Sequence, residues 1–262
     1  MWFLKLVSGV ILLSMVSGAG LADTKSDTAK EQRWAEQIID TLFDGDIVWL
    51  NAQGHQFLGI EMEAADGNNN MAAIVVHGIG VHPNWEQVVR PLRVELTEHG
   101  WRTLSIQMPI LPNEAESMAY QPLFEEVPER FAAAIMHLQD QGIAHIVIVA
   151  HSMGSAMTTQ YMAQNPHSPV EALVLVGMNS NVDNVPVNTA QNLNAIKIPV
   201  LDLYGSEDLA GVIDSAPRRV EAADDGGNIS YHQVVVDGAN HFFDGKEEEL
   251  VNQVSGWLQN LH

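Results

Sequence analysis

The chain has 262 residues, of which 46% are apolar and 17% charged, and its formal net charge is −21 at pH 7. This length suits one large domain with its own core, and the acidity argues against nucleic acid as a partner. The complete absence of cysteine excludes disulfides, thiolate metal sites and a cysteine nucleophile.

The N-terminal segment 1–22 is typical of a signal peptide. Lys5 is its only charged residue, residues 6–16 are mostly apolar, and the small-x-small sequence at 20–22 resembles a cleavage site. A membrane anchor is the alternative, although the apolar stretch is shorter than the roughly 20 residues that span a bilayer. We expect export, to a bacterial periplasm, with no membrane span in the mature chain. Loss of Lys5 would change the net charge from −21 to −22.

Residues 23–33 are polar and lack apolar periodicity, which predicts a flexible leader before a domain at 34–262. The first two strands of this domain suggest an antiparallel hairpin at a sheet edge. Strands and helices then alternate, which predicts a parallel sheet covered on both faces. The predicted elements are a helix at 34–43, strands at 47–50, 57–62 and 72–76, a helix at 86–99, a strand at 102–107, a helix at 124–141, a strand at 145–149, a helix at 153–164, strands at 172–176, 200–204 and 230–236, and a helix at 247–259.

A serine lies where the apolar strand 145–149 must turn sharply into a helix. Ala150 and Gly154 on either side are small enough for strand and helix to pack closely. The spacing small-x-Ser-x-Gly is that of a nucleophile elbow, with alanine in place of the usual first glycine. Because serine and small residues are common, the residues around this motif must decide whether Ser152 is a nucleophile.

Reactive side chains also follow two later strands. Asp208 comes just after the strand 200–204, and His241 follows the strand that ends at Val236. A histidine can take the proton of a serine, and a carboxylate can hold the imidazole in the required tautomer. Glu207 and Asp183 are the alternative positions for the acid.

The tetrahedral intermediate of acyl transfer needs hydrogen-bond donors for its oxyanion, each worth about 3 kcal/mol. The backbone N–H groups of Ile79, in the sequence HGIG after the strand 72–76, and of Met153 are the candidates. No ligand spacing such as HExxH indicates a metal, and we expect no metal or other cofactor. The candidates for the substrate pocket are His77, Gly78, Trp85, Met108 and His151; Trp85 and Met108 could equally belong to the core.

Four motifs together resemble the α/β-hydrolase superfamily, from about Ala72 to the C-terminus: HGIG at 77–80, AHSMG at 150–154, YGSED at 204–208 and DGANHFF at 237–243. The stretch PLRVELTEHGWRTLSIQMPILP at 91–112 also resembles an uncharacterised bacterial α/β-hydrolase-like family, a domain of unknown function. The resemblance implies a mostly parallel, eight-stranded-type sheet flanked by helices and a Ser152-Asp208-His241 triad, and brings no known substrate. Only about 20 residues separate the strands that end at Val176 and begin at Val200, which leaves no room for a large cap domain.

These observations predict an exported serine hydrolase of the carboxylesterase type, which cleaves an ester through an acyl-enzyme on Ser152. The expected substrate is a small molecule or the acylated end of a polymer. An acyltransferase or a peptidase could use the same acyl-enzyme, because the choice of acceptor depends on the shape of the pocket. A non-catalytic envelope protein that uses the fold for binding is the remaining alternative. Nothing in the sequence indicates an oligomeric state.

Overall fold

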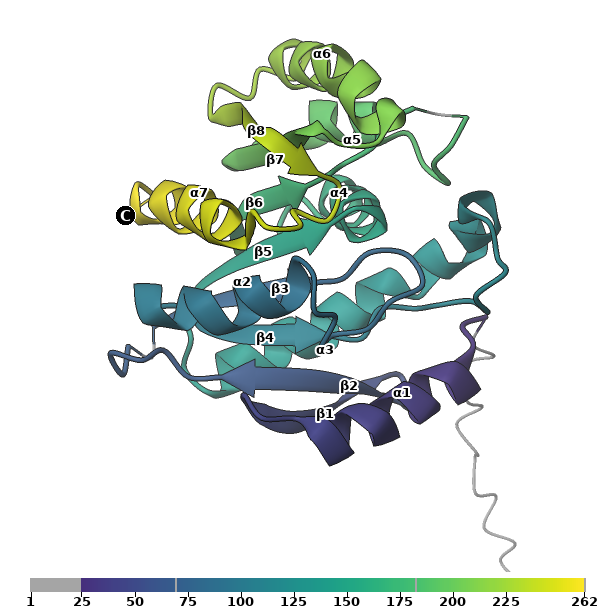
Figure 1. The fold of residues 1–262 in the computed structure, drawn as a ribbon, viewed down its shortest axis with the longest axis vertical. Helices are drawn as coiled ribbons and strands as arrows, with labels where there is room; N and C mark the ends of the chain where they lie inside the picture. The colour runs from purple at the N-terminus through teal and green to yellow at the C-terminus, as the bar shows by residue number, and fades with distance from the viewer. Residues whose placement is uncertain (1–24, 69, 182, 262) are drawn as a thin grey trace, which may run out of the picture.

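The computed structural model describes residues 25–68, 70–181 and 183–261 (Figure 1). The predicted signal peptide at 1–22 lies outside these residues. In the described part of the chain, no helix is both long and apolar enough to cross a membrane.

The described residues form one eight-stranded sheet with the order β1-β2-β4-β3-β5-β6-β7-β8. Strand β2 pairs antiparallel with both β1 and β4, and every other pair of neighbours is parallel. The predicted mostly parallel sheet with an antiparallel hairpin at its edge is therefore confirmed. The strands are β1 (Asp46–Ala52), β2 (His55–Met62), β3 (Met71–Val76), β4 (Arg102–Ile106), β5 (His145–His151), β6 (Val170–Val176), β7 (Val200–Glu207) and β8 (Tyr231–Asn240).

Helices cover both faces of the sheet, because the parallel strands are apolar on both sides. One core lies under α3, α4 and α5 and contains Phe131, Met157 and Leu193. The other lies under α2 and α7, and α1 packs on β2 through a smaller cluster that includes Ile38. Figure 1 shows α1, α2 and α7 in front of the sheet and α3 behind it. The helices are α1 (Thr28–Thr41), α2 (Val89–Glu95), η1 (Leu96–His99), η2 (Ser117–Glu125), α3 (Val127–Asp140), α4 (Met153–Gln164), α5 (Thr189–Ala195), α6 (Ala210–Asp225) and α7 (Glu247–Gln259).

The first helix begins at Thr28, ahead of the predicted start at Trp34, and this corrects the prediction of a flexible leader for residues 28–33. Asp27 caps the helix by accepting a hydrogen bond from the N–H of Lys30 at 2.9 Å. Glu31 is buried and forms an ion pair with Arg130 of α3. The polar residues at the start of the helix therefore have partners inside the fold, which their local pattern does not reveal.

Other helix boundaries differ from the predicted ones at positions where the backbone cannot continue a helix. The predicted helix at 86–99 begins only at Val89, because Val88 has a φ of 57°. The predicted helix at 124–141 divides into η2 and α3, with Pro128 in the first turn of α3. Helices α5 and α6 were not predicted. Among the described residues between β6 and β7, α5 is the only helix or strand, in agreement with the prediction that no large cap domain is inserted there.

Candidate active site

Ser152 lies between the end of β5 and the start of α4, at the edge of the sheet where the parallel strands end. Its backbone has φ 54° and ψ −119°, a conformation that residues with side chains rarely adopt. The Ser152 N–H donates to the carbonyl oxygen of Val176 at 2.8 Å, which ties the turn to β6. A Cβ at Gly154 would lie 2.5 Å from the carbonyl oxygen of His77, so only glycine fits. The strained strand-to-helix turn predicted from the motif is present.

Three side chains from three different strand ends meet at this turn. His241 Nε2 lies 3.0 Å from Ser152 Oγ, and His241 Nδ1 lies 2.6 Å from Asp208 Oδ1. The Asp208 side chain is buried and can only accept when ionised, so His241 Nδ1 carries the proton. The lone pair of Nε2 then accepts from the Ser152 hydroxyl. The three predicted residues thus form one continuous hydrogen-bonded chain.

The structure also separates Asp208 from the alternative acids. Glu207 and Asp183 are both exposed, and neither contacts His241. Asp208 Oδ1 additionally accepts from the N–H of Leu209 at 2.7 Å, which fixes the carboxylate toward the imidazole. Because its position is set by a backbone donor as well as by His241, Asp208 is the carboxylate that the fold orients for this site.

Gly177 at the end of β6 supports the imidazole of His241. It has a φ of 59°, and a Cβ there would lie 3.0 Å from both Cε1 and Nδ1 of His241. Such a contact is shorter than ordinary van der Waals distance. The position therefore requires glycine both for its backbone conformation and for the room that the ring occupies.

The loop after β3 brings Ile79 to the same cavity as Ser152 and Met153. Among the described residues, neither the Ile79 nor the Met153 N–H has a hydrogen-bond partner. His77 orders this loop, since its Nδ1–H donates to the carbonyl oxygen of Gly78 at 2.8 Å and its Nε2 accepts from the N–H of Met108 at 2.9 Å. Burial lowers the pKa of His77 to about 3, so the ring stays neutral.

A cavity of about 330 Å³ opens in front of Ser152 and His241. Its walls are mostly apolar. Ser117 at the start of η2 lines it, and the Ser117 hydroxyl donates to the carbonyl oxygen of Asn184 at 2.7 Å. The wall residues that the sequence did not reveal come from the start of α6 and from the segments around 117 and 179–185: Ser117, Asn179, Asn184, Val185, Leu209, Gly211 and Val212.

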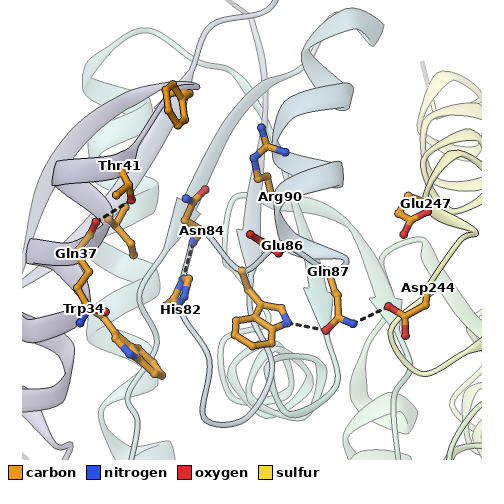
Figure 2. A pocket seen from close by; sticks show the side chains of 13 residues that line it. Trp34, Gln37, Thr41, His82, Asn84, Glu86, Gln87, Arg90, Asp244 and Glu247 are labelled. Atoms are coloured by element: carbon orange, nitrogen blue, oxygen red, sulfur yellow. Dashed lines mark hydrogen bonds between the residues drawn. The ribbon is translucent and has the colours of Figure 1, made fainter.

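The five predicted pocket residues are not among those that line this cavity. Met108 is 1% exposed and belongs to the core under α3, and His77 and His151 are buried behind the loops. Gly78 packs against His151, and Trp85 lines a second, separate cavity (Figure 2). His77, Met108 and His151 instead make hydrogen bonds that hold the loops of the site. The prediction that the five residues form the pocket wall was wrong. Within the described residues, no three His, Cys, Asp or Glu side chains are arranged to hold a metal ion.

Similar folds occur among solved esterases. Est1E from Butyrivibrio proteoclasticus matches with a TM-score of 0.66 at 12% identity, over 83% of this chain and 98% of that protein. The Pyrococcus furiosus esterase Pf2001 matches with a TM-score of 0.68 at 16% identity, over 85% and 95% of the two chains. The fold is that of the α/β-hydrolases.

The family model described as "Protein of unknown function (DUF3530)" matches residues 20–123 and 112–260, and the chain belongs to this family. Among curated proteins, "Putative protein-lysine deacylase ABHD14B" of Rattus norvegicus is 26% identical over 205 residues, which cover 76% of this chain and 90% of that protein. The Homo sapiens protein of the same name is 25% identical over 162 residues, or 62% of this chain and 73% of the relative.

Proposed function

We propose that the protein is an exported serine hydrolase that cleaves an ester through an acyl-enzyme on Ser152. One observation carries the proposal: the chain from Ser152 Oγ to His241 Nε2 at 3.0 Å, and from His241 Nδ1 to Asp208 Oδ1 at 2.6 Å. A serine hydroxyl becomes an effective nucleophile only when an oriented base can take its proton. The cavity places this hydroxyl within reach of a substrate.

The first half of the reaction forms the acyl-enzyme. His241 Nε2 takes the proton of Ser152 as Oγ attacks the carbonyl carbon, and the carbonyl electron pair moves onto oxygen. The free N–H groups of Ile79 and Met153 are the donors for this oxyanion, and the positive end of the α4 dipole adds to them. When the oxyanion collapses, the bond to the alcohol oxygen breaks, and that oxygen takes the proton from Nε2.

Water completes the cycle by the same route. His241 Nε2 takes a proton from water as the water oxygen attacks the acyl carbon, and the second tetrahedral intermediate expels Ser152 Oγ, which recovers its proton from Nε2. Asp208 accepts from His241 Nδ1 and stabilises the imidazolium in both halves. The products are one carboxylic acid and one alcohol, and Ser152 is regenerated.

The cavity supports a short acyl group. Its volume of about 330 Å³ lies near the lower end of ligand pockets, and Val185, Leu209 and Val212 give it an apolar wall. We expect 4-nitrophenyl acetate and butyrate to be hydrolysed much faster than the palmitate ester. A preference for the palmitate ester would contradict this assignment of the acyl site.

Labelling with a fluorophosphonate probe tests the nucleophile directly. The wild type should form one adduct, located on Ser152 by peptide mass spectrometry, and Ser152→Ala should form none. Ser155→Ala is the matched control, because Ser155 lies three residues further along, in the first turn of α4, but is fully buried with its hydroxyl bonded to the carbonyl oxygen of Ala150. An unlabelled wild type would refute the proposal and favour a non-catalytic binding protein. Undiminished labelling of Ser152→Ala would refute Ser152 as the nucleophile.

Hydrolysis of an acyl-lysine amide is a second candidate for the same acyl-enzyme, and the name of the curated relatives is the observation that favours it. Comparing kcat/KM for 4-nitrophenyl acetate and for an acetyl-lysine peptide separates the two.

Export is tested independently by the N-terminal sequence of the protein from its native host. A mature chain that begins at Asp23 supports cleavage after residue 22.

A further inference from the structure

A second cavity, of about 870 Å³, lies between α1, the segment 82–90 and the start of α7 (Figure 2). Aromatic rings form one part of its wall. The His82 ring lies between two indoles, with ring centroids 5.1 Å from Trp34 and 5.6 Å from Trp85 and nearly perpendicular planes. Burial lowers the pKa of His82 to about 4, so this aromatic cluster is uncharged near neutral pH.

Polar side chains with fixed orientations form the rest of the wall. The indole N–H of Trp85 donates to Gln87 Oε1 at 3.2 Å, and Gln87 Nε2 donates to Asp244 Oδ1 at 2.6 Å. Asp244 Oδ2 accepts from Asn240 at 2.9 Å. Figure 2 shows Gln87 and Asp244 side by side at one end of the cavity, and Asn84 next to His82. Amide and carboxylate groups held in this way can exchange several hydrogen bonds with hydroxyl groups of a ligand.

The charges around the cavity disfavour an anionic ligand. Glu86, Asp244 and Glu247 bring carboxylates to its lining. Arg90, which also lines it, is already paired with Asp44. The many polar groups make the cavity a poor site for a lipid tail.

We propose that this cavity binds a neutral carbohydrate chain. Sugar rings present C–H groups that pack on indole faces and hydroxyl groups that pair with amides and carboxylates, which matches the two kinds of wall. Phe43, at the rim, is 94% exposed, and such an exposed aromatic ring extends the apolar surface along which a chain could lie. The size of the cavity suits a ligand longer than one sugar.

The two cavities share the loops of the catalytic centre. The loop after β3 carries Ile79 on the Ser152 side and His82 on the carbohydrate side, and the loop after β8 carries His241 on one side and Asp244 on the other. The substrate is therefore an O-acyl group carried by the bound glycan. This last step rests on the proposed ester hydrolysis, whereas the binding of carbohydrate does not.

Calorimetric titration of Ser152→Ala measures binding without turnover. The probes are the neutral hexasaccharides of β-1,4-linked glucose, xylose and N-acetylglucosamine and of α-1,4-linked glucose, with the anionic hexamer of galacturonic acid for comparison. We expect at least one neutral hexamer to bind, and the anionic hexamer to bind more weakly or not at all. Failure of all four neutral hexamers to bind, or binding of the anionic hexamer alone, would overturn the proposal.

Substitutions locate the site. Trp34→Ala in the Ser152→Ala background should weaken binding by about tenfold or more. Phe43→Ala, which removes an exposed side chain, should weaken binding less. Trp49→Ala is the matched control, because Trp49 is 43% exposed on β1 and lies outside this cavity. Equal binding by the three variants would also overturn the proposal.

Kinetics separate this inference from the proposed function. With Ser152 intact, Trp34→Ala should lower kcat/KM for an O-acetylated form of the bound hexamer about tenfold and leave 4-nitrophenyl acetate hydrolysis unchanged. Hexamer binding without hydrolysis of either ester would refute the ester hydrolase and keep the carbohydrate site. Hydrolysis of 4-nitrophenyl acetate without hexamer binding would refute the carbohydrate site and keep the ester hydrolase.

Discussion

His151 Nε2–H donates to the backbone carbonyl oxygen of His241 at 3.0 Å, and the two rings lie 4.8 Å apart. Burial, with a contribution from the nearby His241, lowers the pKa of His151 to about 3. His151 is therefore a neutral donor that fixes the loop carrying the base, without adding a positive charge next to it. Its Nδ1 has no hydrogen-bond partner within the described residues.

Replacing His151 by Phe should release the His241 loop. The ring volume is kept, but the donor to the carbonyl oxygen is lost, so we expect kcat for 4-nitrophenyl acetate to fall about tenfold with little change in KM. His151→Gln, which keeps a donor amide, should recover part of the loss. Equal kcat in His151→Phe and the wild type would show that this hydrogen bond does not position the base.

Gly177→Ala should move the imidazole of His241. The new Cβ would lie 3.0 Å from the ring, at a backbone φ of 59°. Because misplacing a reacting group by 1 Å can cost about a hundredfold in rate, we expect kcat/KM to fall roughly 10- to 100-fold. Steady-state kinetics measure this effect.

Gly142→Ala is the matched control for Gly177→Ala. Gly142 also has a positive φ, of 86°, but a Cβ there meets nothing within 4 Å. Both variants should lose stability of the order of 1 kcal/mol from backbone strain, which thermal unfolding measures. A comparable fall in activity in both variants would mean that strain, and not contact with His241, causes the loss.

The residues that carry the proposed chemistry could be predicted from sequence because their signals are local. Ser152, Asp208 and His241 each follow a strand within a few residues, and parallel strands bring those ends to one edge. The pocket wall has no such signal. Leu209 and Val212 are ordinary apolar residues that become wall residues only because α6 begins beside Ser152, and α6 was itself not recognised.

The start of α1 shows the same limit of local patterns. Glu31 and His55 lie near the N-terminus, while Arg130, the ionic partner of Glu31, is 99 residues further along the chain. A charged residue in a polar stretch usually indicates exposure. Only the fold, which brings His55 of β2 and Arg130 of α3 to α1, shows that Glu31 is buried and paired.

Acid should destabilise the protein before its carboxylates titrate. The histidines His77, His82 and His151 have pKa values of about 3, 4 and 3 in the fold, against a reference of 6.5. At pH values between the folded-state pKa values and 6.5, these histidines bind protons in the unfolded chain but not in the folded one. Stability is therefore lost as the pH falls below 6.5. The slope is about 1.4 kcal/mol per pH unit for each group that is neutral in the fold and charged in the unfolded chain.

Urea unfolding at pH 7, 6, 5 and 4 measures this slope. His151→Gln should reduce it, because Gln does not titrate, whereas His167→Gln, at an exposed position, should leave it unchanged. Equal free energies of unfolding at pH 7 and pH 5 would contradict the assignment of these rings as neutral.

The buried ion pair of α1 should matter far more than an exposed one. Arg130 donates to both oxygens of Glu31, at 2.8 and 3.0 Å, and also to the carbonyl oxygen of Gln107. Burial opposes ionisation of Glu31, but hydrogen bonds from His55 and Arg130 and the charge of Arg130 outweigh it and lower the pKa of Glu31 to about 2. Removing one partner leaves a buried charge unpaired, which typically costs about 3–5 kcal/mol.

Glu31→Gln should therefore lower the free energy of unfolding at pH 7 by about that amount, whereas Glu249→Gln, in the exposed pair with Lys246, should not change it measurably. The direction in which this contribution to stability changes with pH follows from the lowered pKa of Glu31. The contribution of Glu31 is complete above its reference value of 4.5 and is lost as the pH falls toward 2. The difference between wild type and Glu31→Gln should thus shrink between pH 4.5 and pH 2. A constant difference down to pH 2 would show that the charge of Glu31 is not what holds α1 to α3.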